Sequence, residues 1–241
     1  MFLILSFVLA IGILPIHALP GLEKCVHDNL LKDLMQMQST GGVDDLDQTC
    51  PYVLQIFDCL DNLVVNHTGL TISQLAELIP DETVQNGAKI FMNTRNVLTE
   101  LCTEGMPFNK AYRENVECLS RLGNPLTDCE EKARDTYDSY KEFMDNSVEG
   151  GTPQLEPERT CMMESYKVAC AAAYVMDQCG DASRALFQNL IKRTTYLKYG
   201  PCSNYDTGDL KTKFLSFIEL SGQHRSVFAD AFDFRRKKRS V

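Results

Sequence analysis

The apolar residues of this chain recur every three or four positions along most of its length, as they do in amphipathic helices. The segment TCPYVLQIFDCLDNLVV is typical, because its apolar stripe consists of Val53, Ile56, Phe57, Leu60 and Val64. No segment combines the alternation of a strand with a hairpin turn. The pattern therefore predicts an all-α fold, a bundle of about seven or eight helices of ordinary length.

Turn and capping residues divide this pattern into separate helices. Pro51 stands where the first turn of a helix tolerates proline. Thr71 and Gln74 form a capping-box sequence before a short helix, and residues 127–130 form another. Gly123 follows the last apolar position of its segment, which predicts a helix end there.

The chain begins with the pattern of a secretory signal peptide. An apolar run to Leu14 is followed by Pro15 and ends in a small residue, so we expect cleavage after Ala18. A membrane anchor is the rival interpretation, but the run is too short to span a bilayer well. No later segment approaches the about 20 apolar residues that a spanning helix needs. The sequence therefore predicts a secreted, extracellular protein with no transmembrane segment.

The rest of the chain is predicted to be one helical, cysteine-rich domain, residues 19–232, followed by a basic tail, residues 233–241. Two glycines and two prolines in SVEGGTPQLEP predict an internal boundary near residues 147–157. The tail resembles a furin-type processing site at Arg236, Lys237, Lys238 and Arg239. Either the chain is a precursor trimmed there, which would release only the last two residues, or the tail is a solvated basic segment.

The ten cysteines predict five disulfides, because the number is even and secretion supplies an oxidising compartment. Zinc sites usually have ligand gaps of about two to four residues, and thiol redox sites use C-x-x-C. Neither spacing occurs, and we expect no metal or other cofactor. The cysteines are Cys25, Cys50, Cys59, Cys102, Cys118, Cys129, Cys161, Cys170, Cys179 and Cys202.

Helical phase limits how these cysteines can pair. Cys161, Cys170 and Cys179 follow one another at intervals of nine residues, half a turn out of phase on a helix. Cys161 and Cys179 share a face but would lie about 27 Å apart, far beyond the about 7 Å between Cα atoms that a disulfide spans. Each must therefore bond to a neighbouring helix, which makes this a central helix held on two sides.

The pair Cys50 and Cys59 has the same nine-residue spacing, so these two cysteines cannot bond to each other either. The shared spacing has two interpretations. Helical hairpins are duplicated along the chain, or separate helices simply need similar staples. The sequence leaves both open, because its self-similarity has no regular period.

Charge and glycosylation signals narrow the choice of partners. The formal net charge of -9 argues against a nucleic-acid partner, which would require an excess of Lys and Arg. The sole acceptor sequon is Asn66-His67-Thr68, and in a secreted chain it predicts a glycan on a surface loop.

Catalytic motifs are scarce. The chain has neither a Gly-x-Ser-x-Gly elbow nor a His-Glu-x-x-His pattern. The segment CVHDNLL resembles the Cys-His-Asp part of secreted phospholipases A2, although Cys25 is single and no glycine-rich calcium loop precedes it. A hydrolase would need His27 or His224 in a cleft beside a carboxylate or a nucleophile. His67 lies inside the sequon and is interpreted as a surface residue.

The segment LCTEGMPFNKAYRENVECL and the later YKVACAAAYVMDQCGDASRALFQNLI, with their flanking cysteines, resemble a loose group of secreted, cysteine-rich helical proteins of invertebrates. Arthropod haemolymph glycoproteins and nematode extracellular domains of unknown function belong to this group. The resemblance covers residues 100–202 and rests on the cysteine order and the Cys-Gly-x-x-Ala turn. It implies an extracellular helical protein and supplies no catalytic residues.

We therefore expect a secreted, non-enzymatic glycoprotein that binds an extracellular protein partner or a small apolar ligand between its helices, where bundles place their sites. The alternatives are a secreted hydrolase, of phospholipase A2 type or novel, and a precursor trimmed at the basic tail.

Overall fold

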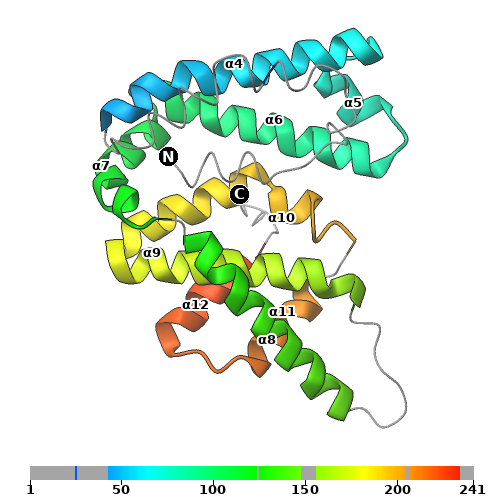
Figure 1. The fold of residues 1–241 in the computed structure, drawn as a ribbon, viewed down its shortest axis with the longest axis vertical. Helices are drawn as coiled ribbons and strands as arrows, with labels where there is room; N and C mark the ends of the chain where they lie inside the picture. Colours follow the sequence, from blue (N-terminus) through cyan, green and yellow to red (C-terminus); the bar gives the residue numbers. More distant parts are fainter. Residues whose placement is uncertain (1–24, 26–42, 124, 148–155, 205–206, 234–241) are drawn as a thin grey trace, which may run out of the picture. The chain divides into compact units, whose positions relative to one another are not determined.

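A computed structural model describes residue 25 and residues 43–123, 125–147, 156–204 and 207–233 (Figure 1). Their regular secondary structure is entirely helical, so the predicted all-α class is confirmed. Eight helices have seven residues or more, and α10 is a single turn of four residues. The described elements are α4 (Val43–Thr68), α5 (Ile72–Leu78), α6 (Glu82–Cys102), α7 (Pro107–Arg121), α8 (Pro125–Ser147), α9 (Glu156–Thr194), α10 (Tyr196–Tyr199), α11 (Thr207–Phe217) and α12 (Gly222–Ala231).

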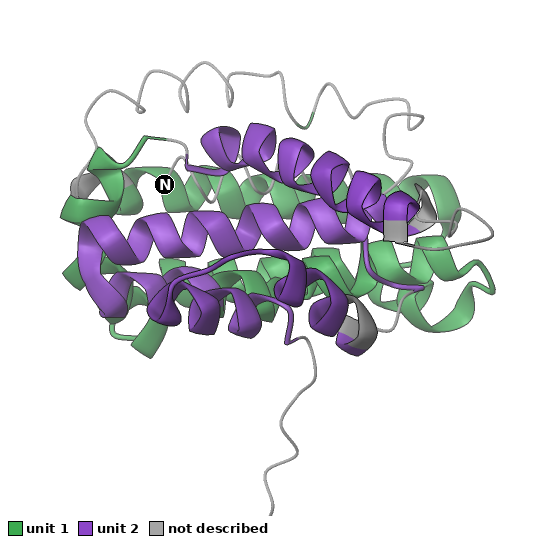
Figure 2. Ribbon diagram, turned by 90° about the horizontal axis from the view of Figure 1, so that it is seen from below, with its two compact units in different colours: residues 1–123, 189–200 green, residues 124–188, 201–241 purple. Residues whose placement is uncertain are grey.

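The chain forms two compact units, which Figure 2 distinguishes by colour. Unit 1 comprises residues 1–123 and 189–200, and unit 2 comprises residues 124–188 and 201–241. The boundary that the sequence predicts near residues 147–157 falls within the range of unit 2. It stays a prediction, because residues 148–155 lie outside the described part of the chain.

Helix α6 is the centre of unit 1, where it contacts α4, α5, α7 and α10. The apolar stripe predicted for α4 supplies part of this core, since Val53, Phe57 and Val64 are all buried. The rings of Phe57 and Phe91 lie 4.9 Å apart, which joins α4 to α6. The amphipathic pattern of the sequence therefore identifies the inner face of α4, with Ile56 and Leu60 half-buried at its edge.

Two of the predicted helix boundaries in unit 1 are confirmed. Thr71 Oγ1 accepts a hydrogen bond from the Gln74 N–H at 3.2 Å, and Gln74 Oε1 accepts one from the Thr71 N–H at 2.9 Å, which completes the capping box of α5. Helix α7 ends at Arg121, and Gly123 follows with a φ of 65°, a conformation in which glycine avoids the strain of a Cβ atom.

Two other boundaries were predicted wrongly. Helix α4 begins at Val43, so Pro51 lies inside the helix and not in its first turn. Leu46, five residues before Pro51, is 2% exposed. Its burial stabilises the first turns of α4, which outweighs the low preference of proline for the interior of a helix. Helix α8 begins at Pro125, because proline's fixed φ suits the first position of a helix. Thr127 therefore lies within the first turn of α8 and does not cap it.

In unit 2, the part of α9 that carries the regularly spaced cysteines is buried on nearly all sides. Gly180 has a φ of 84° and a ψ of 178°, which interrupts the helix. The side chains buried before the break are Cys161, Met162, Ser165, Val168, Ala169, Ala171, Ala172, Ala173, Val175 and Met176. The prediction of a central helix is therefore confirmed.

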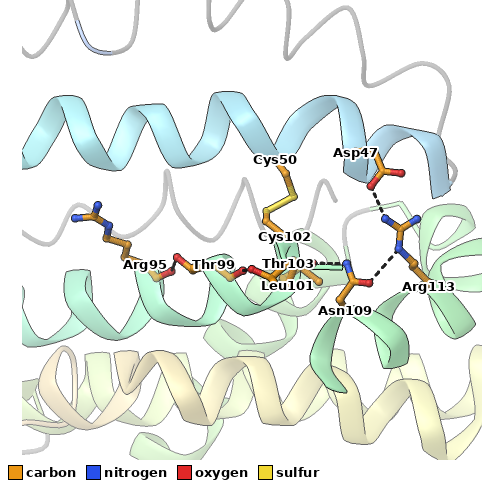
Figure 3. Close-up of a disulfide and its surroundings, with 9 residues drawn as sticks. All are labelled: Asp47, Cys50, Arg95, Thr99, Leu101, Cys102, Thr103, Asn109 and Arg113. Atoms are coloured by element: carbon orange, nitrogen blue, oxygen red, sulfur yellow. Dashed lines mark hydrogen bonds and ion pairs between the residues drawn. A yellow bond between two sulfur atoms is a disulfide. The ribbon is translucent and has the colours of Figure 1, made fainter. Parts of the chain in front are cut away.

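The disulfides follow the rule that helical phase imposes. On α9, Cys170 bonds to Cys129 of α8, with Cα atoms 5.8 Å apart. Cys161 bonds to Cys202, with Cα atoms 4.7 Å apart, and because Cys202 lies in a turn, the prediction of a helical partner is wrong there. On α4, Cys50 bonds to Cys102 at the end of α6 (Figure 3). Cys59 bonds to Cys25. Cys118 and Cys179 are also disulfide-bonded, and no cysteine is free.

The disulfides of the two units follow the same pattern of connection. In both, a long helix carries a pair of cysteines nine residues apart, the first bonded to a later segment and the second to an earlier one, and α9 carries Cys179 in addition. A glycine with positive φ stands ten residues after the second cysteine in each case, Gly69 at 71° and Gly180 at 84°. This agreement in topology and backbone conformation favours a duplicated helical module over staples that arose separately.

Candidate functional site

Unit 2 contains a continuous cluster of aromatic side chains from α8, α9, α11 and α12, which we call the aromatic cluster. Its centre is Phe214, which is 0% exposed. The Phe214 ring lies 5.3 Å from Tyr140, 6.1 Å from Tyr166 and 6.1 Å from Phe232, in the tilted or edge-on arrangements that aromatic rings prefer. The members are Tyr140, Phe143, Tyr166, Phe214, Phe217, Phe228 and Phe232.

One end of the aromatic cluster reaches solvent. The Phe143 side chain is 52% exposed, and its ring lies 5.3 Å from that of the half-buried Phe217. The Phe217 ring lies in turn 5.3 Å from buried Tyr140. Tyr137, Tyr140 and Phe143 are spaced by three residues, so each lies next to the following one and the row turns gradually around α8. A continuous row of rings therefore leads from the surface into the core of unit 2.

The hydroxyl group of Tyr140 lies within this apolar surrounding. Burial raises the pKa of Tyr140 above its ordinary value of 10.0, and the negative charge of Glu158 raises it further. The phenol is therefore neutral at physiological pH and behaves as part of an apolar wall with one polar atom.

Arg159 lies beside Tyr137, at the buried end of this row on α8. Its guanidinium group stands 5.7 Å from the centre of the Tyr137 ring, a cation–π contact. Its Nε atom is buried and has no hydrogen-bond partner. Buried polar atoms in proteins nearly always have a partner, so this group is an exception within unit 2.

A second charged group, in unit 1, has its partners. The Glu100 carboxylate accepts hydrogen bonds from the Arg193 guanidinium and from the backbone N–H of Phe108, in the first turn of α7. Arg193 also stands 5.3 Å from the centre of the Phe108 ring. These contacts lower the pKa of Glu100 below its ordinary value of 4.5, chiefly through the Arg193 hydrogen bond, although burial opposes the shift.

Replacing Glu100 with glutamine should therefore destabilise the protein in a pH-dependent way. A lowered pKa stabilises the folded state above the ordinary value of 4.5, and this stability is lost as the pH falls through the folded pKa. We expect a loss of about 1–2 kcal/mol at about pH 7, discounted because solvent screens Arg193, and a smaller loss at about pH 3. Urea denaturation at both pH values measures this difference.

The matched control is Glu104→Gln, because Glu104 is exposed. It should change the free energy of unfolding little at either pH. Equal losses for Glu100→Gln at the two pH values would contradict the role assigned to its charge.

Other ion pairs of unit 1 are structural. Figure 3 shows Arg113 between Asp47 of α4 and the Oδ1 atom of Asn109, whose side-chain amide donates to the Leu101 carbonyl. Arg95 of α6 pairs with Asp58 and Asp61 of α4. These contacts join helices and satisfy buried groups, and they leave no charge of their own for a ligand.

The structure places the predicted histidines as follows. His224 Nε2 lies 3.1 Å from both carboxylate oxygens of Asp177, and both side chains are exposed, by 36% and 47%. Among the described residues, no hydroxyl or thiol is hydrogen-bonded to this pair. His67 is exposed in the last turn of α4, and His27 lies outside the described residues. The hydrolase alternative stays a prediction, and the contact between His224 and the Asp177 carboxylate is the one observation from the described residues in its favour.

The glycosylation sequon differs from the prediction in one respect. Asn66 is exposed, but it lies in the last turn of α4 and not on a loop. Thr68 Oγ1 donates a hydrogen bond to the Val64 carbonyl at 2.8 Å, as helical threonines commonly do. The apolar stripe of α4 therefore extends the helix through the sequon.

Several other predicted features lie outside the described residues. They are the signal cleavage site at Ala18 and the basic residues Arg236, Lys237, Lys238 and Arg239. Of the helices that the structure describes, none has both the length and the apolar character that crossing a membrane requires. The described part of the chain contains no group of three or more His, Cys, Asp or Glu side chains that could hold a metal ion.

Comparison with known protein families, curated sequences and solved structures finds no match to this chain. The resemblance to secreted, cysteine-rich helical proteins of invertebrates therefore stays a prediction.

Proposed function

We propose that this chain is a secreted, non-enzymatic extracellular glycoprotein, and that unit 2 binds a small apolar ligand at the exposed end of the aromatic cluster. The observation that carries the proposal is the exposure of Phe143, which stands next to a row of rings that runs into the core. An apolar ligand seated there would cover both Phe143 and Phe217. Removing apolar surface from water contributes roughly 25 cal/mol per Å² of area.

The disulfides support the extracellular part of the proposal. Every cysteine is paired, as is expected in an oxidising compartment and unusual in the cytosol. The Cys129–Cys170 disulfide also favours a binding protein, because it fixes the position of α8 relative to α9, and both helices contribute rings to the aromatic cluster. A preorganised surface binds a ligand with less loss of conformational entropy.

The proposal predicts that the protein binds a neutral apolar dye through Phe143. Titration with Nile red should give a saturable, blue-shifted rise in fluorescence. Phe143→Ser should weaken the binding at least about fivefold, because it removes an exposed aromatic contact worth about 1 kcal/mol or more. Fluorescence titration at constant ionic strength measures both affinities.

The matched control is Leu78→Ser, since Leu78 is 62% exposed at the end of α5 in unit 1. This variant should bind the dye as the wild type does. Absence of saturable binding by the wild type, or equal weakening by the two variants, would show that the aromatic cluster is not the site.

A further inference from the structure

Among the half-buried arginines of the described chain, Arg159 differs from the others. Arg95, Arg113, Arg184 and Arg193 each form an ion pair with a carboxylate. Arg159 has neither an ion pair nor a hydrogen bond among the described residues, and its Nε atom is buried. A guanidinium group has five N–H donors arranged to bind a planar anion. The Arg159 side chain is only half-buried, so an anion from solvent can reach the donors beyond its buried Nε atom.

We infer that the ligand of unit 2 is an acid with an apolar chain, of the fatty-acid class, and that Arg159 binds its carboxylate. This inference rests on the proposed function, because it assigns the second half of the ligand whose apolar part covers Phe143 and Phe217. A carboxylate matches the guanidinium fork with two parallel hydrogen bonds. Charge complementarity thus specifies which kind of apolar molecule the site takes.

The spacing along α8 suits such a ligand. Arg159 stands over the Tyr137 ring, and Phe143 follows six residues later, about 120° away around the helix, with Tyr140 between them. Six residues of helix span about 9 Å. An extended acyl chain of medium length covers that distance, so its carboxylate can meet Arg159 while its carbon atoms lie against Phe143 and Phe217.

The surrounding charges make Arg159 necessary for an acidic ligand. The chain has a formal net charge of -9, and Glu158 precedes Arg159 on α9 without pairing to it. The carboxylate of an acidic ligand would be repelled by this negative charge if no positively charged side chain faced it. Arg159 therefore supplies the positive charge that an acidic ligand needs. The raised pKa of Tyr140 keeps its hydroxyl group neutral, so Tyr140 does not repel the carboxylate of the ligand.

The experiment compares two ligands that differ only in the head group. Dodecanoic acid and dodecanol are titrated against the wild-type protein carrying Nile red, and displacement of the dye gives both affinities. We expect the acid to bind at least about tenfold more tightly than the alcohol. Arg159→Gln should remove this preference while leaving the affinity for the alcohol unchanged, and Arg159→Lys should keep part of it.

The control variant is Arg134→Gln, which changes an exposed arginine of α8 and should keep the full preference. Equal affinities of the wild type for the two ligands would overturn the inference, and this result does not depend on how any variant folds. If the dye still binds through Phe143 in that case, the proposed function survives. If the wild type binds neither the dye nor the acid, both fail.

Discussion

Replacing Phe214 with alanine should lower the free energy of unfolding by about 3–5 kcal/mol, a large part of the about 5–15 kcal/mol that stabilises a typical domain. Phe214 is 0% exposed, and its ring contacts Tyr140 of α8, Tyr166 of α9 and Phe232. Truncation removes apolar burial and leaves a cavity among three rings that cannot all move inward. Urea denaturation followed by circular dichroism measures the change.

Phe143→Ala is the matched control for this prediction, because it removes the same side chain from the exposed end of the same cluster. Phe143 is 52% exposed, so we expect a loss below about 1 kcal/mol. Similar losses for the two variants would mean that Phe214 does not lie at the centre of the unit 2 core.

Removing the Cys129–Cys170 disulfide with a double alanine substitution should destabilise the protein by about 2–5 kcal/mol. The staple joins α8 to the central helix α9 across 41 residues of sequence, so its loss frees the unfolded chain. The Cys161–Cys202 staple has the same separation of 41 residues. Removing the Cys161–Cys202 disulfide should therefore increase the entropy of the unfolded chain equally. Any difference between the two variants in the free energy of unfolding then arises from the packing of the folded state.

The single variant Cys170→Ala tests the connectivity directly. It should expose one reactive thiol, and peptide mapping after maleimide labelling under denaturing conditions should locate that thiol at Cys129. Labelling at Cys161 or Cys179 would contradict the rule that cysteines nine residues apart on a helix cannot bond to each other.

The fold could be predicted from the sequence wherever one local signal decided the outcome. Apolar spacing identified the inner face of α4, and helical phase correctly excluded a Cys50–Cys59 bond. The capping box at Thr71 needs only residues three positions apart, so it too was confirmed. The start of α4 was predicted wrongly, because the burial of Leu46 depends on tertiary packing that outweighs the preference of Pro51.

The candidate site was harder to predict, because its parts are distant in sequence. The stripe of Tyr137, Tyr140 and Phe143 on α8 is visible in the sequence as helical spacing. The rings of α11 that meet it cannot be found from spacing alone, since Phe214 and Phe217 come about seventy residues later. Arg159 stands out only once the described part of the chain shows that its buried Nε atom has no hydrogen-bond partner.

The repeated disulfide pattern was likewise predictable only in part from the sequence. The nine-residue spacing of cysteines was visible in the sequence, but it left two interpretations open. The pairing in each unit, together with the positive φ of Gly69 and of Gly180, favours duplication. Sequence spacing can limit which cysteines pair, whereas their actual partners depend on how the helices pack.

Native mass spectrometry of the protein purified from the cells that produce it tests the central claim most directly, with wild type and Phe143→Ser prepared side by side. The account predicts that the folded wild type carries extra mass, beyond the disulfide-bonded chain and its glycan, which is released on unfolding as an acid with an apolar chain. Phe143→Ser should carry less of it. A wild type whose mass is fully explained by polypeptide and glycan, and which takes up no dodecanoic acid when it is added, would contradict the account.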